Sequence, residues 1–242
     1  MLPNVKRALP LLAMALTAAA GPHKVVRNTA ELDFRYEWPS EAVAIPALDL
    51  KFYTDAKRQL VEAQESAPED KKQYQEQGRG SVRDSYWAKW TTTGQSSRLL
   101  SLRYESEEYT GGAHPNQNVS DLLWDRELGR EIKFANLFEV ADGYPPALQS
   151  TYCHKFEREK VKRTGNPIDR EVFTCPKLSE LASLLIDKNK NGHFEAIDFA
   201  APPYALGSYA EGEYNIVVPV TAQLIASFKP EYRSSFEVHR LQ

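Results

Sequence analysis

A short stretch near the middle of the chain constrains its fold more than any other. It runs from Tyr109 to Asn116 with the sequence YTGGAHPN, and a segment of alternating polar and apolar residues precedes it. The two glycines allow positive φ, while Pro115 fixes its own φ and moves His114 out of the helical region. We therefore predict a tight loop between two strands, carrying one imidazole and one phenol ring at a sheet edge.

The apolar periodicity on either side of this loop predicts an α+β fold with antiparallel sheets and packed helices. Strands are expected within residues 24–38, at 82–104 with a turn at 92–95, at 117–124 and at 214–220. One helix is predicted to begin near Pro46, where a stripe of apolar residues starts, and another carries Leu148, Tyr152 and Phe156. Residues 69–76, after Pro68, are predicted to be a loop or a solvated face, and residues 178–186 a short helix. Thr221 is expected to cap a last short helix.

The length of the chain bounds its domain organisation. With 242 residues and 42% hydrophobic content it can bury a substantial core. Because the sequence contains no long linker and no repeat, the prediction is two closely associated α/β subdomains, at residues 24–125 and 126–242, after a signal peptide at residues 1–20.

The first twenty residues have the pattern of an export signal. Lys6 and Arg7 form a positive start, an apolar run from Ala8 to Leu16 follows, and small residues end at Ala20. We expect cleavage near Ala20 and a periplasmic or secreted mature protein. The alternative is a buried N-terminal helix. No other segment approaches membrane-spanning length, so no membrane span is expected in the mature chain.

Charge limits the class of partner. The formal charge of the whole chain is −3, and removal of the two signal-peptide cations changes it to −5. A mildly acidic protein has no electrostatic basis for binding nucleic acid, so that partner is excluded. A basic protein partner would suit this charge better.

The chain contains two cysteines, Cys153 and Cys175. In an exported protein an isolated pair predicts a disulfide, and the alternative is two buried thiols. The absence of a Cys-x-x-Cys motif excludes a redox site of that type.

Residues 187–198, with the sequence DKNKNGHFEAID, fit the template of a twelve-residue calcium loop. The tentative Ca2+ ligands are Asp187, Asn189, Asn191, Glu195 and Asp198, and residues 181–186 would form the entering helix. Three features oppose this hypothesis: an aspartate at the twelfth position, two lysines within the loop, and a predicted strand at 194–199 in place of an exit helix. The alternative is a turn rich in Asn and Gly between two elements.

His114 is the first candidate for a catalytic group, because a single imidazole can act as acid or base. No partner occurs at a motif spacing, and the serine-hydrolase, zinc-protease, phosphate-loop and dinucleotide motifs are all missing. A structural role is therefore favoured, in which His114 and Tyr109 lock the turn through hydrogen bonds. The sequence has many carboxylates, so a glycosidase pair stays open.

Three segments in this order resemble one protein family. They are YTGGAHP at residues 109–115, a second segment from Asp125 to Phe138 with the pattern DxxxGxxIxFxxLF, and PYxxGxYAxG at 203–212 leading into VxPV at 217–220. Together they resemble the extracytoplasmic domain shared by the anti-sigma factor RsiV and the N-terminal part of the peptidoglycan deacetylase PdaC. The resemblance implies a PdaC-like subdomain at 24–125 and an RsiV-like one at 126–242.

The resemblance also implies a function. RsiV-like members bind lysozyme, and PdaC-like members carry this domain beside a separate catalytic domain. We expect a stand-alone, exported and non-catalytic recognition domain of the cell envelope, which binds a lysozyme-like protein or peptidoglycan and requires no cofactor. The expected binding residues are Tyr109, Gly111, Gly112, His114, Pro115, Tyr204 and Tyr209. The alternatives are an enzyme that acts on envelope glycans through His114 and nearby carboxylates, and a structural envelope protein without a specific ligand.

Overall fold

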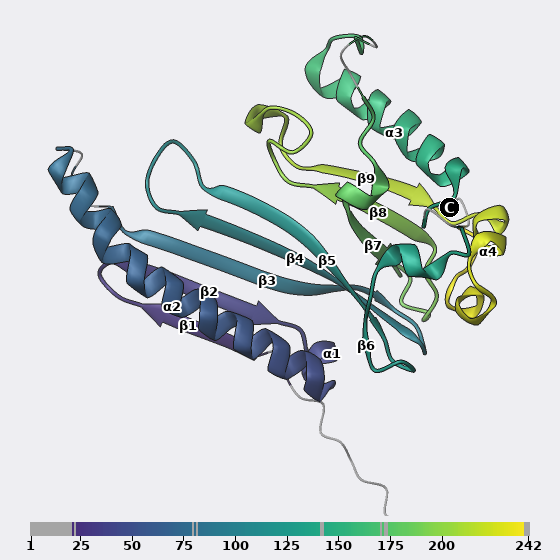
Figure 1. Cartoon of the computed structure of the whole chain (residues 1–242), viewed down its shortest axis with the longest axis horizontal. Coiled ribbons are helices and arrows are strands. Elements are labelled where there is room, and N and C mark those ends of the chain that lie inside the picture. Colours follow the sequence, from purple (N-terminus) through teal and green to yellow (C-terminus); the bar gives the residue numbers. More distant parts are fainter. Residues whose placement is uncertain are drawn as a thin grey trace, which may run out of the picture.

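The computed structural model of the chain (Figure 1) describes residues 21, 23–78, 80, 82–140, 143–169, 171 and 174–239. Two sheets and their helices form an α+β fold, which confirms the predicted class. The predicted signal peptide at residues 1–20 lies outside the described residues.

The first sheet has six strands in chain order. They are β1 (His23–Asn28), β2 (Leu32–Trp38), β3 (Asp84–Gln95), β4 (Leu99–Tyr109), β5 (Asn116–Asp125) and β6 (Arg130–Ile132). All neighbours are antiparallel except β2 and β3, which run parallel. The single strand expected within 24–38 is thus a hairpin, because Thr29 accepts a hydrogen bond from the Leu32 amide at 3.0 Å and turns the chain.

Two helices follow β2: the short α1 (Ser40–Val43) and the long α2 (Pro46–Glu76), which lies over β1, β2 and β3 (Figure 1). The predicted stripe is buried, with Leu48, Phe52 and Ala56 almost fully covered. Of the two alternatives for residues 69–76, the solvated face is right and the loop is wrong, because the helix continues through Pro68 and no residue from 69 to 76 is buried. Ala67 is buried beside that proline, and an ion pair of 3.0 Å between Lys71 and Glu31 fastens the next turn to the start of β2.

The second sheet contains three antiparallel strands, β7 (Ala182–Ile186), β8 (Ala196–Ala201) and β9 (Tyr214–Pro219), with α3 (Pro146–Thr164) packed on β9. The predicted helix at 178–186 is wrong beyond a 3₁₀ turn at Leu178–Glu180. Leu184 packs with Val119 of the first sheet, whereas Leu185 packs in the main core. Because both faces of β7 are buried, its apolar run imitates a helical stripe.

The two sheets are joined by hydrogen bonds from β7. The Leu185 amide donates to Ser101 Oγ at 2.9 Å, and Thr93 Oγ1 donates to the Leu185 carbonyl at 2.8 Å. The predicted turn at 92–95 is instead the end of β3, with a register shift between Thr92 and Gly94. Glycine is needed there, because a Cβ at position 94 would lie 2.7 Å from the Asp187 amide nitrogen.

The C-terminal part contains α4 (Ala222–Ser227), where Thr221 accepts a hydrogen bond from the Leu224 amide as predicted.

The predicted disulfide is confirmed: Cys153 of α3 bonds to Cys175, 22 residues further along the chain. In the described part of the chain, every helix falls short of the length or apolar character that crossing a bilayer requires. The subdomain boundary after residue 125 stays a prediction.

Candidate functional site

Three of the predicted binding residues meet although they come from two distant segments. His114 lies in the loop between β4 and β5, and Tyr204 and Tyr209 lie in the loop between β8 and β9. The His114 ring stacks on Tyr209 with 3.7 Å between centroids and an interplanar angle of 13°. The Tyr204 ring lies 5.6 Å from that of Tyr209, and its hydroxyl oxygen is 3.0 Å from His114 Nε2. These three side chains are called the aromatic cluster below.

Hydrogen bonds use both ring nitrogens of His114. Nδ1 lies 3.1 Å from the Pro115 carbonyl, which can only accept, so Nδ1 carries the proton. In the neutral imidazole Nε2 then accepts from the Tyr204 hydroxyl. Among the described residues, no carboxylate contacts this ring in the way that orients a catalytic histidine. The geometry suits a fixed aromatic surface better than a free base.

The loop that carries His114 is braced from two directions. The Tyr109 hydroxyl donates to the Gly112 carbonyl at 3.1 Å, so Tyr109 closes its own loop and stays outside the aromatic cluster. Tyr74, near the end of α2, packs directly on Gly111, whose φ is +104°. A Cβ at position 111 would overlap the Tyr74 ring. These contacts give Gly111 a packing role that its sequence motif alone does not reveal.

The loop that carries the two tyrosines is anchored on α3. Lys160 Nζ donates to the Leu206 carbonyl at 2.8 Å and to Glu211 at 2.9 Å. Arg163 donates to the carbonyls of Glu211 and Glu213, both at 2.7 Å. Sequence reasoning missed Lys160 and Arg163, because charged residues on a helix give no sign of the loop, some fifty residues away, that they will hold.

Glu211 is the centre of this anchor. The Tyr214 hydroxyl, Lys160 and the Ser208 amide all donate to its carboxylate, and they lower the pKa of Glu211 to about 2. A Cβ at Gly207 would lie 2.5 Å from the same carboxylate, so the chain passes as close to it as glycine allows. Glu211 therefore stays ionised at neutral pH and holds the loop in one shape.

Tyr204 occupies an unfavourable backbone conformation. Its φ is +70°, in the left-handed region that bulky residues rarely adopt, and 62% of the residue is exposed. Exposure and strain together show that the surrounding loop holds this ring out towards solvent beside His114.

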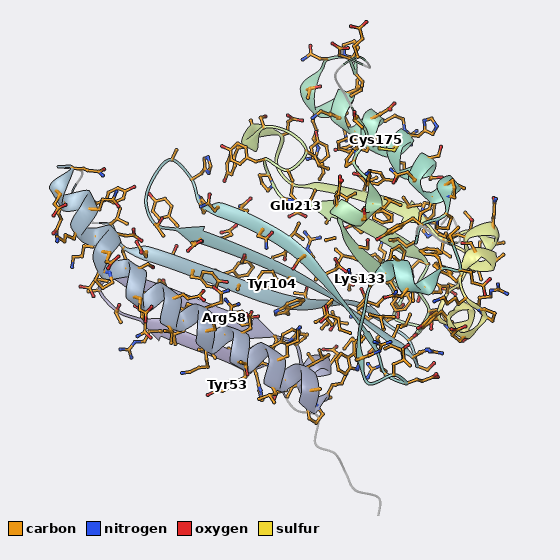
Figure 2. The ribbon with its side chains drawn as sticks, in the orientation of Figure 1. Tyr53, Arg58, Tyr104, Lys133, Cys175 and Glu213 are labelled. Atoms are coloured by element: carbon orange, nitrogen blue, oxygen red, sulfur yellow. A yellow bond between two sulfur atoms is a disulfide. The ribbon has the colours of Figure 1, made fainter. Side chains whose placement is uncertain are left out.

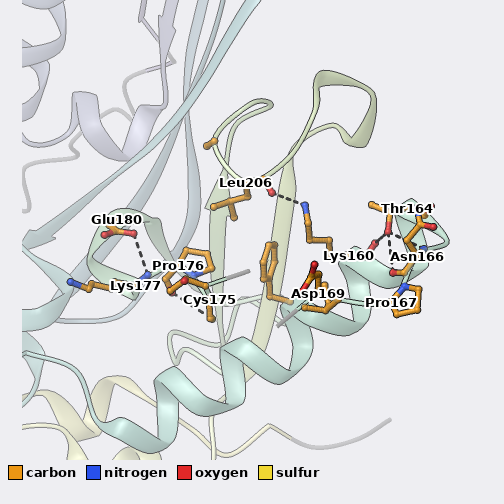
Figure 3. Close-up of a pocket in the computed structure, with 14 residues that line it drawn as sticks. Lys160, Thr164, Asn166, Pro167, Asp169, Cys175, Pro176, Lys177, Glu180 and Leu206 are labelled. Atoms are coloured by element: carbon orange, nitrogen blue, oxygen red, sulfur yellow. Dashed lines mark hydrogen bonds between the residues drawn. The ribbon is translucent and has the colours of Figure 1, made fainter. Parts of the chain in front are cut away.

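A hollow of about 750 Å³ lies behind the same loop, between α3 and the segment around Cys175 (Figure 3). Its lining includes Phe156, Lys160 and Leu206, and the bond from Lys160 to the Leu206 carbonyl runs along it. None of the predicted binding residues and none of the tentative calcium ligands lines this hollow.

The predicted calcium loop forms a turn whose oxygens bind the backbone. Both Asp187 oxygens accept amide hydrogen bonds, from Asn191 at 3.1 Å and from Gly192 at 3.0 Å. Glu195 accepts from the Lys188 amide at 2.9 Å. The helix predicted to enter the loop is absent from residues 182–186, because these residues form strand β7 and pair with β8.

One of the remaining tentative ligands lies beside Asp187: the Asn191 amide donates both to Asp187 Oδ1, at 3.1 Å, and to Asn189 Oδ1, at 3.0 Å. Asn189 and Asn191 accept from backbone amides of the turn, and both donate to Glu237. Asp198 lies in β8 and faces Arg103 across 3.7 Å, and burial raises its pKa to about 6. Within the described ranges, no group of three or more His, Cys, Asp or Glu side chains is placed to hold a metal ion. Calcium binding stays a prediction.

Comparisons with known proteins give a family for part of the chain and a fold for most of it. Residues 25–117 match the family model described as deacetylase PdaC. The fold is similar to the crystal structure of a DUF3298 family member from Bacteroides fragilis NCTC 9343, with a TM-score of 0.57 and 16% identity, covering 88% of this chain and 95% of that one. A DUF3298 family protein from Pseudomonas aeruginosa PAO1 gives a TM-score of 0.49 at 14% identity, covering 89% and 97%. No curated protein matches the chain.

Proposed function

We propose that the protein, whose residues 25–117 match the family model described as deacetylase PdaC, is an exported recognition domain that binds a lysozyme-like protein through the aromatic cluster, without turnover. The observation that carries the proposal is the stack of His114 on Tyr209 beside the exposed ring of Tyr204. Aromatic side chains of this kind dominate the binding energy of many protein interfaces.

Rigidity supports this function. The tyrosine loop is held by Lys160, Arg163 and the ionised Glu211, and the histidine loop by Tyr74 and Tyr109. A partner that docks here orders little that is not already ordered, so less of the contact energy is lost as conformational entropy.

Charge supports the choice of partner. Lysozymes are commonly basic, and the chain without its predicted signal peptide has a formal charge of −5. Long-range attraction would then raise the association rate and make it fall with added salt. Peptidoglycan, the other predicted partner, gains nothing from this charge, and the experiment below tests it in parallel.

The state of His114 favours binding over catalysis. Its Nε2 lone pair accepts from Tyr204, and its Nδ1 hydrogen bonds a backbone carbonyl. A hydrolytic mechanism that used His114 as a base would first have to replace the Tyr204 hydroxyl at Nε2 with a water molecule or a substrate hydroxyl.

The test uses purified protein, hen lysozyme and insoluble peptidoglycan. Binding is measured by calorimetry or sedimentation over a range of salt, and muramidase inhibition is followed alongside. The double variant Tyr204→Ala/Tyr209→Ala should weaken lysozyme binding by more than about tenfold, as truncated interface aromatics do. Tyr53→Ala is the matched control, because Tyr53 is 51% exposed and lies on α2 (Figure 2), whereas the aromatic cluster lies on the β4–β5 and β8–β9 loops.

Three results separate the hypotheses. Unchanged lysozyme binding in the tyrosine double variant would exclude the aromatic cluster as the surface. Binding to peptidoglycan alone, lost in the same variant, would replace the protein partner with the glycan. Hydrolysis or deacetylation of peptidoglycan by the wild type, abolished in His114→Ala, would establish the enzyme instead.

A further inference from the structure

A groove lies between α2 and the far strands of the first sheet. α2 covers β1, β2 and β3, but β4 and β5 extend beyond it (Figure 1). The second sheet covers the opposite face of these strands, where Val119 of β5 packs with Leu184. The face of β4 and β5 beside the helix is left open, and the groove there has a volume of about 440 Å³. That volume lies within the range of about 300–1,000 Å³ seen for small-ligand sites.

Strand register defines the floor of this groove. Three rows of directly paired residues cross β3, β4 and β5 on the face towards α2. The rows are Trp90–Tyr104–Ser120, Ala88–Ser106–Asn118 and Tyr86–Glu108–Asn116. Because paired residues share a face and alternate positions repeat it, the floor changes from mainly aromatic on β3 to wholly polar on β5.

The aromatic side of the floor is fixed in place. The hydroxyls of Tyr86 and Tyr104 are 2.9 Å apart, and Trp90 Nε1 donates to the Tyr36 hydroxyl at 2.8 Å. The Trp90 and Tyr104 rings lie 4.9 Å apart. Their polar atoms are therefore used within the protein. Tyr86, Trp90 and Tyr104 are each 9% exposed, so a small part of each residue reaches the groove. Figure 2 shows Tyr104 on the sheet and Arg58 on the helix, on the two sides of the groove.

The polar side of the floor is unused. Further along the same face, where α1 and α2 cover it, the residues are apolar, as at Leu102 and Leu122. Towards the β4–β5 loop it carries Ser106, Asn118 and Ser120. Within the described part of the chain, these three side chains make no hydrogen bond. A sheet face lined with free hydroxyl and carboxamide groups beside packed aromatic rings is organised for a polar ligand.

Charge narrows the class of ligand. The helix wall supplies Asp55, Arg58 and Gln59, and Arg58 forms an ion pair with Asp55. The carboxylates that line the groove are Asp55 and Glu108. Asp55 is paired with Arg58, whereas no ion pair among the described residues includes Glu108. Such a groove would repel polyanions and has too many polar groups for an apolar ligand.

We propose that this groove binds an uncharged oligosaccharide. Each sugar hydroxyl both donates and accepts hydrogen bonds, which matches serine hydroxyls and carboxamides. The C–H groups of a pyranose ring would contact the small exposed part of Trp90 and Tyr104. The site is separate from the aromatic cluster, because the groove lies on the α2 side of the sheet, whereas His114 contacts the loop between β8 and β9. The proposal of an oligosaccharide site is therefore independent of the proposal that the aromatic cluster binds a lysozyme-like protein.

Calorimetric titration of the purified protein tests this site with chitotetraose and cellotetraose, and with tetragalacturonate as an anionic probe of similar size. At least one neutral tetrasaccharide should bind saturably, and the anionic one more weakly. Asn118→Ala should lower the affinity by about tenfold, the effect of losing one or two hydrogen bonds. Ser106→Trp, which fills the centre of the floor, should abolish binding.

Controls make the outcome decisive. Gln223→Ala removes an exposed carboxamide on α4, outside the groove, and should leave the affinity unchanged. Tyr204→Ala/Tyr209→Ala should also leave it unchanged, which separates this test from that of the protein partner. Thermal melts verify folding, and Asn118→Ala carries the test alone if Ser106→Trp does not fold. No saturable binding of either neutral probe, equal affinity in Asn118→Ala, or equally tight binding of tetragalacturonate would overturn the proposal.

Discussion

His114 Nε2 lies 3.0 Å from the hydroxyl oxygen of Tyr204, although 90 residues separate the two along the chain. The contact joins the β4–β5 loop of one sheet to the β8–β9 loop of the other. Neither loop could present the cluster alone, since one carries the imidazole and the other both tyrosines. The relative position of the two sheets is therefore part of the site.

Strain at Tyr204 predicts an unusual order of stability among its variants. Both Tyr204→Ala and Tyr204→Gly remove the ring, but only glycine adopts a φ of +70° without cost. Tyr204→Gly should therefore be more stable than Tyr204→Ala by about 1 kcal/mol in urea denaturation. At an ordinary exposed position the order is the reverse, and finding that reverse order here would show that the backbone is not strained.

Packing of Tyr74 predicts different effects at two neighbouring glycines. Gly111 and Gly112 both have positive φ, but only a Cβ at position 111 would meet Tyr74. Gly111→Ala should lower the free energy of unfolding by about 1 kcal/mol more than Gly112→Ala. The difference should shrink in a Tyr74→Ala background, and its persistence there would mean that Tyr74 is not the cause.

Glu211 predicts a loss of stability in acid. Its pKa is lowered from 4.5 to about 2 in the folded chain, so the carboxylate stabilises the fold above its unfolded pKa. That contribution is lost as pH falls from about 4.5 to about 2. Over this pH window the free energy of unfolding of the wild type should fall by about 1–2 kcal/mol more than that of Glu211→Gln, after allowance for solvent screening. Urea denaturation at several pH values measures the difference, and parallel curves would contradict it.

The turn at Asp187 predicts a stability effect with and without calcium. Asp187→Ala removes two hydrogen bonds from backbone amides. In EDTA this substitution should lower the free energy of unfolding by about 1–3 kcal/mol. If the predicted calcium site forms, millimolar calcium raises the melting temperature of the wild type but not of Asp187→Ala. Equal wild-type melting temperatures in calcium and EDTA would leave the turn without a metal role.

Local patterns in the sequence determined much of the secondary structure. Alternation at Phe34, Tyr36 and Trp38 marks a buried strand face, and Pro46 begins α2. Gly165 ends α3 in the left-handed conformation, and Thr221 caps α4. Each of these features depends on neighbours within about four residues. The disulfide was also predictable, because two cysteines allow a single intramolecular pairing.

Tertiary structure decided what depends on distant residues. Residues 182–186 are a strand because both faces of β7 are covered, and α2 continues through Pro68 because Ala67 is buried and Lys71 reaches Glu31. The aromatic cluster and the groove share this origin. Their side chains come from strands, loops and a helix whose distances apart in space are fixed only when the sheets pack. Sequence periodicity reports which face of an element is apolar, but not which other element will lie against it.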